Sequence, residues 1–240
     1  MLLLDGVHLV TDALAAGVRV HEATVAADAL ARRDIIALVG RLSDAGVEAV
    51  AASAAVMAAI SPMRSASAIV ALADRPVSAP AGLYATPAPL VVVAVDVQDP
   101  GNLGAIVRVA EAGGASGVVV AGTSADPCGW KALRGSMGSA LRLPILLRKA
   151  ADDLFEPRRH GCRVLATAPR GGRSPFDLDL TGPLAVLIGG EGPGLDLAIL
   201  AEADERVTIP MQPPVESLNV AVTAALIVYE AQRQRAASRK

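Results

Sequence analysis

Aromatic residues are scarce in this chain of 240 residues, which contains two Phe, two Tyr and one Trp. Proteins that bind single-stranded nucleic acid on an open sheet stack the bases on several aromatic rings, so the composition argues against that class. Cysteine is equally scarce: Cys128 and Cys162 stand far apart without CxxC spacing, which argues against a disulfide framework and a cysteine zinc site. The three histidines, His8, His21 and His160, have no metal-ligand spacing. We therefore expect no bound metal.

Long apolar runs and common hydrolase or deaminase signatures are also missing. No stretch of about 18 uncharged apolar residues predicts a membrane helix. The start, MLLLDGVHLV, has no basic region of the kind that signal peptides carry. Neither GxSxG nor HxE with PCxxC occurs. We therefore predict a soluble, cytoplasmic protein.

Neither sign of charge is in strong excess, because the net charge is −2 at pH 7 and the isoelectric point is near 5.9. Nucleic-acid binding through overall charge alone is thus disfavoured. Residues 1–85 carry 6 basic and 8 acidic side chains, whereas the rest of the chain carries 16 of each. Solvated surface charge and a local RNA groove both remain interpretations of the basic residues in the second part. These are Arg142, Arg148, Lys149, Arg158, Arg159, Arg163, Arg170, Arg173 and the tail at 233–240.

Apolar residues make up 52% of the chain and suffice for a large core. Residues 77–89, VSAPAGLYATPAP, are rich in Pro, Ala and Gly without apolar periodicity, which predicts a linker. Before this segment we expect a small α/β domain. Its helices are expected at 8–16, 32–45 and 53–60, and its strands at 22–25, 47–51 and 68–72.

After the linker, apolar runs rich in β-branched residues alternate with helical patterns and glycine loops. The runs are at 90–95, 118–121, 163–167, 184–188 and 206–209. Strands that are apolar on both faces belong to buried parallel sheets, so we predict an open, doubly wound sheet. Ligands bind at the carboxyl ends of the strands in such sheets.

The first of three motifs at these strand ends is DPGNLGAIVRVAEAGG, residues 99–114. It predicts a helix that ends at its Gly-Gly pair and leaves Arg108 off the apolar stripe. The stripe consists of Leu103, Ile106, Val107 and Ala110. An ion pair of Arg108 with Glu111 and a helix N-cap at Asn102 remain alternatives to substrate contacts.

The second motif, LIGGEGPGLD at 187–196, places four glycines around Glu191 after a buried strand. Glycines allow a ligand to approach the main chain closely. The pattern is neither GxGxxG nor GxxxxGK[ST], so it indicates neither a dinucleotide site nor a triphosphate site. A nucleoside held by loop amides fits better, and an ordinary tight turn is the alternative.

The third motif, IPMQPPVESLNVAVTAA at 209–225, follows the last predicted strand. Its proline-rich loop leads to a helix that we expect to run through Gln232. Ser217 is a candidate helix cap, and Asn219 is a candidate for a hydrogen bond within the first turn. The face expected to pack consists of Leu218, Val222, Ala225 and Tyr229.

Together the three motifs resemble motifs 1, 2 and 3 of the SpoU, or TrmH-like, branch of the SPOUT RNA 2'-O-ribose methyltransferases. The segment SPMRSASAIVALADRP resembles the exit from the L30e-like domain that precedes many such catalytic domains. The resemblance implies an L30e-like RNA substrate-binding domain at 1–76, a linker at 77–89 and a SPOUT domain with a deep trefoil knot at 90–240. It also implies a homodimer with active sites near the subunit interface.

The same resemblance implies a cofactor, a substrate and a set of site residues. S-adenosylmethionine is the expected methyl donor, and a ribose 2'-OH in rRNA or tRNA is the expected acceptor. The residues expected to bind the donor are Gly189, Ile209, Leu218, Thr167, Gly190 and Met211. The residues expected at catalytic positions are Arg108, Asn102, Glu191, Ser217 and Asn219.

Arg108 is described in this family as the base, but a guanidinium is protonated at almost any pH, because its pKa exceeds about 12. We hypothesise that Arg108 orients the hydroxyl and stabilises the developing alkoxide. Because residues 1–85 are net acidic, we expect the C-terminal arginine clusters to contact the RNA. A catalytically silent RNA-binding or ribosome assembly factor and a different nucleoside-dependent enzyme remain alternatives.

Overall fold

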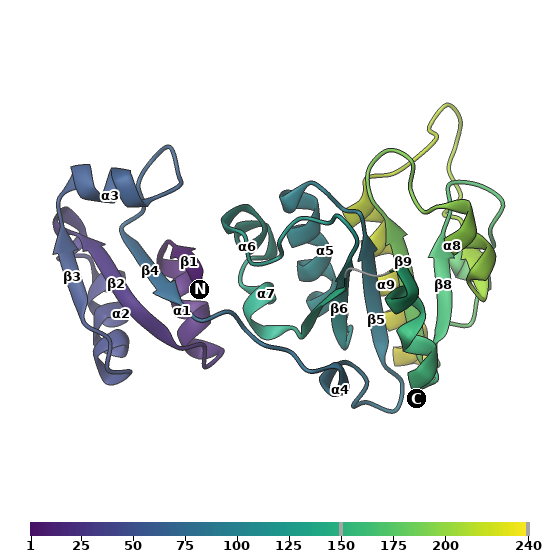
Figure 1. Cartoon of the computed structure of the whole chain (residues 1–240), viewed down its shortest axis with the longest axis horizontal. Coiled ribbons are helices and arrows are strands. Elements are labelled where there is room, and N and C mark those ends of the chain that lie inside the picture. Colours follow the sequence, from purple (N-terminus) through teal and green to yellow (C-terminus); the bar gives the residue numbers. More distant parts are fainter. Residues whose placement is uncertain (149–150, 239–240) are drawn as a thin grey trace.

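The N-terminal part of the chain forms a four-stranded sheet in the computed structural model, which describes residues 1–148 and 151–238. The strands are β1 (Leu2–Asp5), β2 (Val20–Ala26), β3 (Ala49–Ala52) and β4 (Ile69–Ala73), in the spatial order β1-β4-β2-β3. Strand β4 is antiparallel to β1 and β2, and β2 is parallel to β3. The helices are α1 (Val7–Ala15), α2 (Arg33–Asp44) and α3 (Ala54–Ile60), with a 3-10 turn at Ala27–Ala29 (Figure 1).

Apolar periodicity explains why most of these elements form where the sequence predicts them. Helix α2 buries Ile35, Leu38 and Leu42, which are spaced by three and four residues. Strand β1 was not predicted. It forms because Leu2 and Leu4 are buried beneath the helices when β1 pairs with β4.

The C-terminal part forms a six-stranded sheet in which every neighbouring pair of strands is parallel. The strands are β5 (Leu90–Val95), β6 (Gly117–Ala121), β7 (Ile145–Arg148), β8 (Arg163–Thr167), β9 (Leu184–Gly189) and β10 (Glu205–Val207). Their spatial order is β10-β8-β9-β5-β6-β7. The predicted parallel sheet is thus confirmed. Strand β7 was not predicted, and β10 ends at Val207 rather than at residue 209.

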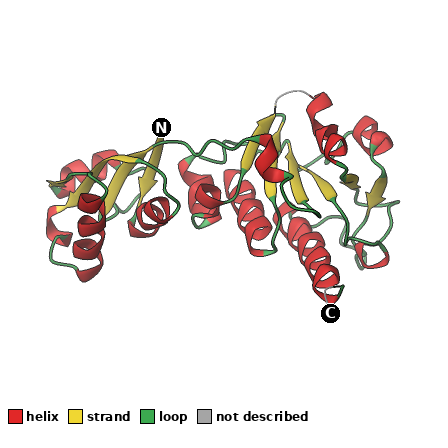
Figure 2. Ribbon diagram, turned by 90° about the horizontal axis from the view of Figure 1, so that it is seen from below, coloured by secondary structure: helices red, strands yellow, loops and turns green. Residues whose placement is uncertain are grey.

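Helices cover both faces of this sheet, as Figure 2 shows. They are α4 (Pro80–Leu83), α5 (Pro100–Ala112), α6 (Trp130–Ser136), α7 (Ser139–Arg142), α8 (Leu197–Glu202) and α9 (Val220–Ala237), with 3-10 segments η2 (Ala151–His160) and η3 (Pro175–Asp177). Val92 and Ala94 pack in the core that contains α5 and α9, whereas Val91 and Val93 pack on the opposite side with α4 and η2. This arrangement explains why the strands are apolar on both faces.

Residues 77–89 connect the two sheets and pack against the second one. Leu83 of α4 is fully buried, and the Tyr84 ring stacks on His160 at a centroid distance of 3.8 Å. The two parts also contact each other directly, because Arg142 of α7 lies 3.6 Å from the Asp12 carboxylate of α1. Within the described residues, none of the helices combines the length and the apolar character needed to cross a membrane.

Candidate functional site

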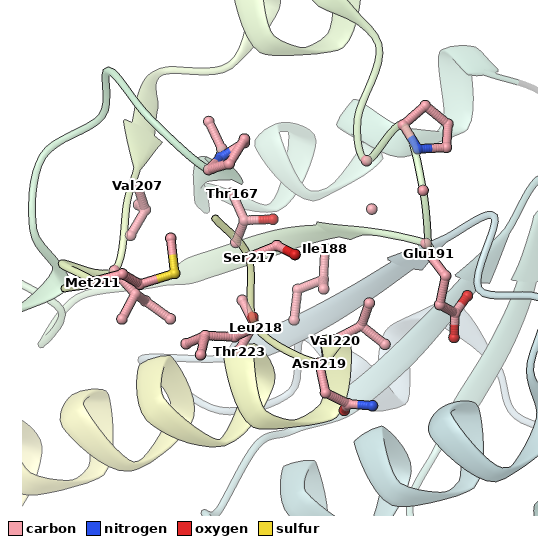
Figure 3. A pocket seen from close by; sticks show the side chains of 18 residues that line it. Thr167, Ile188, Glu191, Val207, Met211, Ser217, Leu218, Asn219, Val220 and Thr223 are labelled. Carbon is pink, nitrogen blue, oxygen red and sulfur yellow. The ribbon is translucent and has the colours of Figure 1, made fainter. Parts of the chain in front are cut away.

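A pocket of about 350 Å³ opens at the carboxyl ends of β8, β9 and β10 (Figure 3). This is the edge of a parallel sheet where ligands ordinarily bind, and the volume lies in the range of small-molecule sites. All the residues predicted to bind a cofactor line this pocket: Thr167, Gly189, Gly190, Ile209, Met211 and Leu218. Glu191, Ser217 and Asn219 line it as well.

The glycine loop after β9 approaches the end of β5 too closely for any side chain at Gly190. A Cβ atom at this position would lie 1.9 Å from the main-chain oxygen of Asp96. Asp96 itself has a left-handed φ of 54°, and its carboxylate accepts hydrogen bonds from the amide and hydroxyl of Thr123. The left-handed turn at Asp96 therefore presses its carbonyl group against the loop, which leaves room only for glycine.

The walls of the pocket are mostly apolar, and the polar side chains of Glu191 and Asn219 lie at one end. Ile188, Val207 and Val220 contribute to the walls although they were not among the predicted site residues. These residues occupy the ends of two strands and the start of α9, so their position in the predicted elements was the signal that they face the site. The Thr167 hydroxyl donates to the main-chain oxygen of Leu187 at 3.1 Å.

A chain of hydrogen bonds links the three motifs at the polar end of the pocket. The Asn219 Nδ2 donates to Asn102 Oδ1 at 2.9 Å, and the Asn102 Nδ2 donates to Glu191 Oε1 at 2.6 Å. Asn219 Oδ1 accepts from the amides of Ala221 and Val222 at the start of α9. Because each amide group both donates and accepts, the orientation of Asn219 determines that of Asn102.

The hydrogen bonds also correct three interpretations of the motifs. Asp99, and not Asn102, caps α5, because its Oδ1 accepts from the amide of Asn102 at 2.8 Å. Asn219, and not Ser217, caps α9. The helix begins at the residue after Asn219 and extends beyond the predicted Gln232 to Ala237. In both helices the cap is the short polar side chain that lies directly before the first helical residue.

Arg108 is exposed on α5 and does not pair with Glu111. Instead Arg142 binds Glu111 through two hydrogen bonds of 2.8 Å and holds the pKa of that carboxyl below its ordinary value. With the described part of the chain Arg108 forms neither a hydrogen bond nor an ion pair, and it does not line the pocket. The structure thus brings together four of the five predicted catalytic residues.

The predicted packing face of α9 is wrong. Val222 and Tyr229 are 46% and 48% exposed, whereas the side of the helix that packs against α5 and β9 contains Ala224, Ile227 and Val228. Both sides of this helix are apolar, so periodicity alone does not show which one covers the sheet.

The C-terminal arginine clusters form ion pairs rather than an open basic surface. Besides Arg142, which binds Glu111, five of the predicted positions each lie within ion-pair distance of a carboxylate on a neighbouring segment. They are Arg148 with Glu156, Arg158 with Asp204, Arg163 and Arg173 with Glu205, and Arg170 with Glu216. Arg233 likewise pairs with Glu230. Lys149, Arg239 and Lys240 lie outside the described residues.

The sequence of the chain matches one protein family over most of the C-terminal part. Residues 89–229 match the model of the SpoU rRNA Methylase family, which covers more than half of the chain. The chain belongs to the SpoU rRNA methylase family. It is 38% identical over 133 residues to the 23S rRNA (guanosine(2553)-2'-O)-methyltransferase RlmP of Bacillus subtilis. The aligned residues cover 55% of this chain and 54% of RlmP.

Two solved methyltransferase structures share the fold over nearly the whole chain. One is the SpoU methyltransferase AviRb from Streptomyces viridochromogenes in complex with the cofactor AdoMet, with a TM-score of 0.86 and 30% sequence identity. The superposition covers 98% of this chain and 90% of AviRb. An AdoMet-bound rRNA methyltransferase from Sinorhizobium meliloti has a TM-score of 0.84 and 27% identity, covering 97% of this chain and 87% of that one. The chain spans about half the length of the curated relatives that it matches.

Proposed function

We propose that this SpoU family protein is an RNA methyltransferase that uses S-adenosylmethionine to methylate a ribose 2'-OH in rRNA or tRNA. The observation that carries the proposal is the joining of the three motifs at one pocket through Asn219, Asn102 and Glu191. The names of the relatives support the reaction, because RlmP and AviRb are described as methyltransferases.

The residues of the pocket fit a nucleoside with an aliphatic sulfonium group. Gly189 and Gly190 let the loop pack directly against the backbone at Gly194 and Asp96 along one side of the pocket, and Ile209 and Leu218 provide apolar walls. Thr167 and Met211 complete the predicted binding set. S-adenosylmethionine would supply an electrophilic methyl group when bound, and these pocket residues would hold it, with Glu191 and Asn219 on the same lining.

The polar residues position the acceptor rather than provide a strong base. Asn102 and Glu191 form a rigid pair that contacts the ribose, and Ser217 lies on the adjacent wall. Arg108 orients the hydroxyl and stabilises the negative charge that develops as the proton leaves. Its exposed guanidinium has no carboxylate partner among the described residues, so its charge is available to RNA.

We also propose the architecture that the family resemblance implies. Residues 1–76 form an L30e-like RNA substrate-binding domain, 77–89 a linker and 90–240 a SPOUT domain with a deep trefoil knot. The return of the chain supports the knot: after the edge strand β10, Asn219 reaches Asn102 and α9 packs against α5 in the middle of the sheet. The two free cysteines support a cytoplasmic location.

We propose a homodimer in which α9 contributes to the interface. The outer side of this helix exposes Val222, Leu226 and Tyr229, and the nearby Phe176 is 57% exposed. These residues line one hollow on the surface. Contiguous exposed apolar residues of this kind mark protein contacts.

Transfer of tritium from labelled S-adenosylmethionine to RNA tests the proposed function. We expect label in 2'-O-methylnucleosides after digestion of the RNA. Replacement of Arg108 by Ala should reduce transfer at least 100-fold, an order of magnitude typical of a lost transition-state contact, while calorimetry still detects donor binding. Transfer to no RNA would favour the silent RNA-binding factor, and undiminished single-turnover transfer by Arg108→Ala would exclude the role of this residue.

A further inference from the structure

The cations that lack a carboxylate partner are unevenly distributed over the molecule. Four of them lie on three segments between the N-terminal sheet and the pocket: Arg64 on the loop before β4, Lys131 and Arg134 on α6, and Arg108 on α5. In Figure 1, α6 lies between the N-terminal sheet and α5. The other described cations without an ion pair are scattered over α2 and other distant segments: Arg19, Arg33, Arg41, Arg159 and Arg206.

Close packing of α5 against α6 places Arg108 one helical turn from the point where the two helices touch. A Cβ atom at Gly104 would lie 2.4 Å from the main-chain oxygen of Ala132, so the two helices touch through their backbones. Arg108 is one turn beyond Gly104 on α5 and lies on the same side of that helix. Lys131 and Arg134 are both exposed and are spaced three residues apart on α6, so they share one face of that helix.

The loop that carries Arg64 is fixed to both parts of the molecule. The buried carboxylate of Asp5 accepts hydrogen bonds from Ser61 Oγ, at 2.6 Å, and from Ser67 Oγ, which anchors both ends of the loop. The Arg134 guanidinium contacts the sulfur of Met63 in the same loop. Arg64 is therefore held beside α6 although it is itself exposed.

We propose that Arg64, Arg134 and Lys131 form a track that binds the phosphate backbone of the substrate RNA and leads it to Arg108 and the pocket. The proposal rests on the proposed function and names the surface that its RNA uses. It replaces the predicted C-terminal arginine clusters, since most of their described side chains already pair with carboxylates. Cations without partners release more free energy on binding a phosphate, because no ion pair has to be broken.

The test compares two triple variants that remove the same charge. The track variant combines Arg64→Gln, Lys131→Gln and Arg134→Gln. The control combines Arg159→Gln, Arg173→Gln and Arg206→Gln, which lie outside residues 1–76 and on segments other than α5 and α6. RNA affinity is measured by filter binding with total rRNA and tRNA over a range of salt concentrations. We expect the track variant to bind RNA at least about tenfold more weakly at low salt, and its salt slope to fall by about 2. The control should bind like the wild type.

Two further measurements separate RNA binding from catalysis. Donor binding by calorimetry and kcat at saturating RNA should be unchanged in the track variant, while KM for RNA rises. Trp130 is the single Trp of the chain, and the Lys131 ammonium lies 5.5 Å from the centre of its ring. RNA should therefore change the fluorescence of the wild-type protein.

The outcomes distinguish the track from the proposed function. If the wild type methylates RNA but the track variant binds as tightly as the wild type, or if the control loses as much affinity, the track is wrong and the function stands. If the wild type transfers no methyl group to any RNA, the proposed function fails. Salt-dependent RNA binding that is lost only in the track variant would then still support the surface.

Discussion

At the scale of single residues, the site depends on backbone contacts that leave no space for a side chain. Gly190 is the clearest case, because the carbonyl of Asp96 occupies the position of its missing Cβ. The carbonyl cannot easily move away, since Thr123 holds the Asp96 side chain through two hydrogen bonds. A substitution at Gly190 must therefore displace the glycine loop from the pocket.

Replacement of Gly190 by Ala should weaken donor binding at least about tenfold, which corresponds to ~1.4 kcal/mol, and lower the stability of the protein. Isothermal calorimetry and urea unfolding measure the two effects. Gly40→Ala is the matched control, because Gly40 is exposed within α2 and a Cβ atom there meets no other atom. That substitution should stabilise the protein by up to about 1 kcal/mol. Tight donor binding by Gly190→Ala would show that the loop is not pressed against Asp96.

The strand pattern predicted that the three motifs meet at one edge of the sheet, because the carboxyl ends of parallel strands lie there. The family resemblance then named Gly189, Ile209 and Leu218, which do line the pocket, but neither source predicted the polar contacts beside it. By contrast, the partner of Glu111 is Arg142, 31 residues away, and helical spacing gives no information about such a pair. The Asn102–Glu191 hydrogen bond spans 89 residues and was not predictable from the separate motifs for the same reason.

At the scale of helices and strands, sequence periodicity predicted where elements form better than which side they bury. Helix α5 buries Leu103, Ile106 and Ala110, as the spacing indicated, because its outer side is polar. Helix α9 is apolar on two sides, and only the position of α5 and β9 determines that Ala224 and Ile227 face inward. The strand β7 was not predicted because Ile145 is its one β-branched residue, whereas the predicted runs are rich in such residues.

Contacts between elements predict a pH dependence of stability. Arg142 of α7 joins Glu111 of α5 to Asp12 of α1 and lowers the pKa of Glu111 from its ordinary value of 4.5. A lowered pKa in the folded state stabilises the protein at pH values above 4.5, and this contribution is lost as the pH falls through the folded pKa. Because Glu111 is partly exposed, we expect at most about 1 kcal/mol.

Replacement of Glu111 by Gln should therefore reduce the free energy of unfolding at pH 7 and have little effect near pH 3. Urea unfolding of wild type and variant at the two pH values measures the difference. Glu216→Gln serves as the control, because its ion pair with Arg170 is almost fully exposed and should contribute little. An equal loss of stability by Glu111→Gln at both pH values would mean that the ion pair with Arg142 is not the cause.

At the scale of the whole molecule, two sheets of different topology lie on either side of α6 and α7 (Figure 1). The N-terminal sheet contacts the C-terminal part through Asp12 and through an ion pair of Arg75 with Asp126. The exposed side of α9 adjoins α5, because Val109 lines the same hollow as Val222 and Tyr229. The surface proposed to bind RNA and the surface proposed to contact a second subunit therefore both border α5.

The apolar side of α9 predicts a dimer that one charge disrupts. Each chain has a mass of 24.3 kDa, so the wild type should have twice this mass in sedimentation equilibrium. Tyr229→Glu places a carboxylate in the centre of the exposed apolar side and should produce a monomer, because burial of an unpaired charge costs several kcal/mol. Leu197→Glu is the control: Leu197 is 81% exposed on α8 and does not line the hollow beside α9, so this variant should remain a dimer. A wild type that sediments as a monomer would exclude the dimer. A dimer that Tyr229→Glu leaves intact while Leu197→Glu breaks it would place the interface elsewhere, since the charge acts only where the apolar side chains are covered.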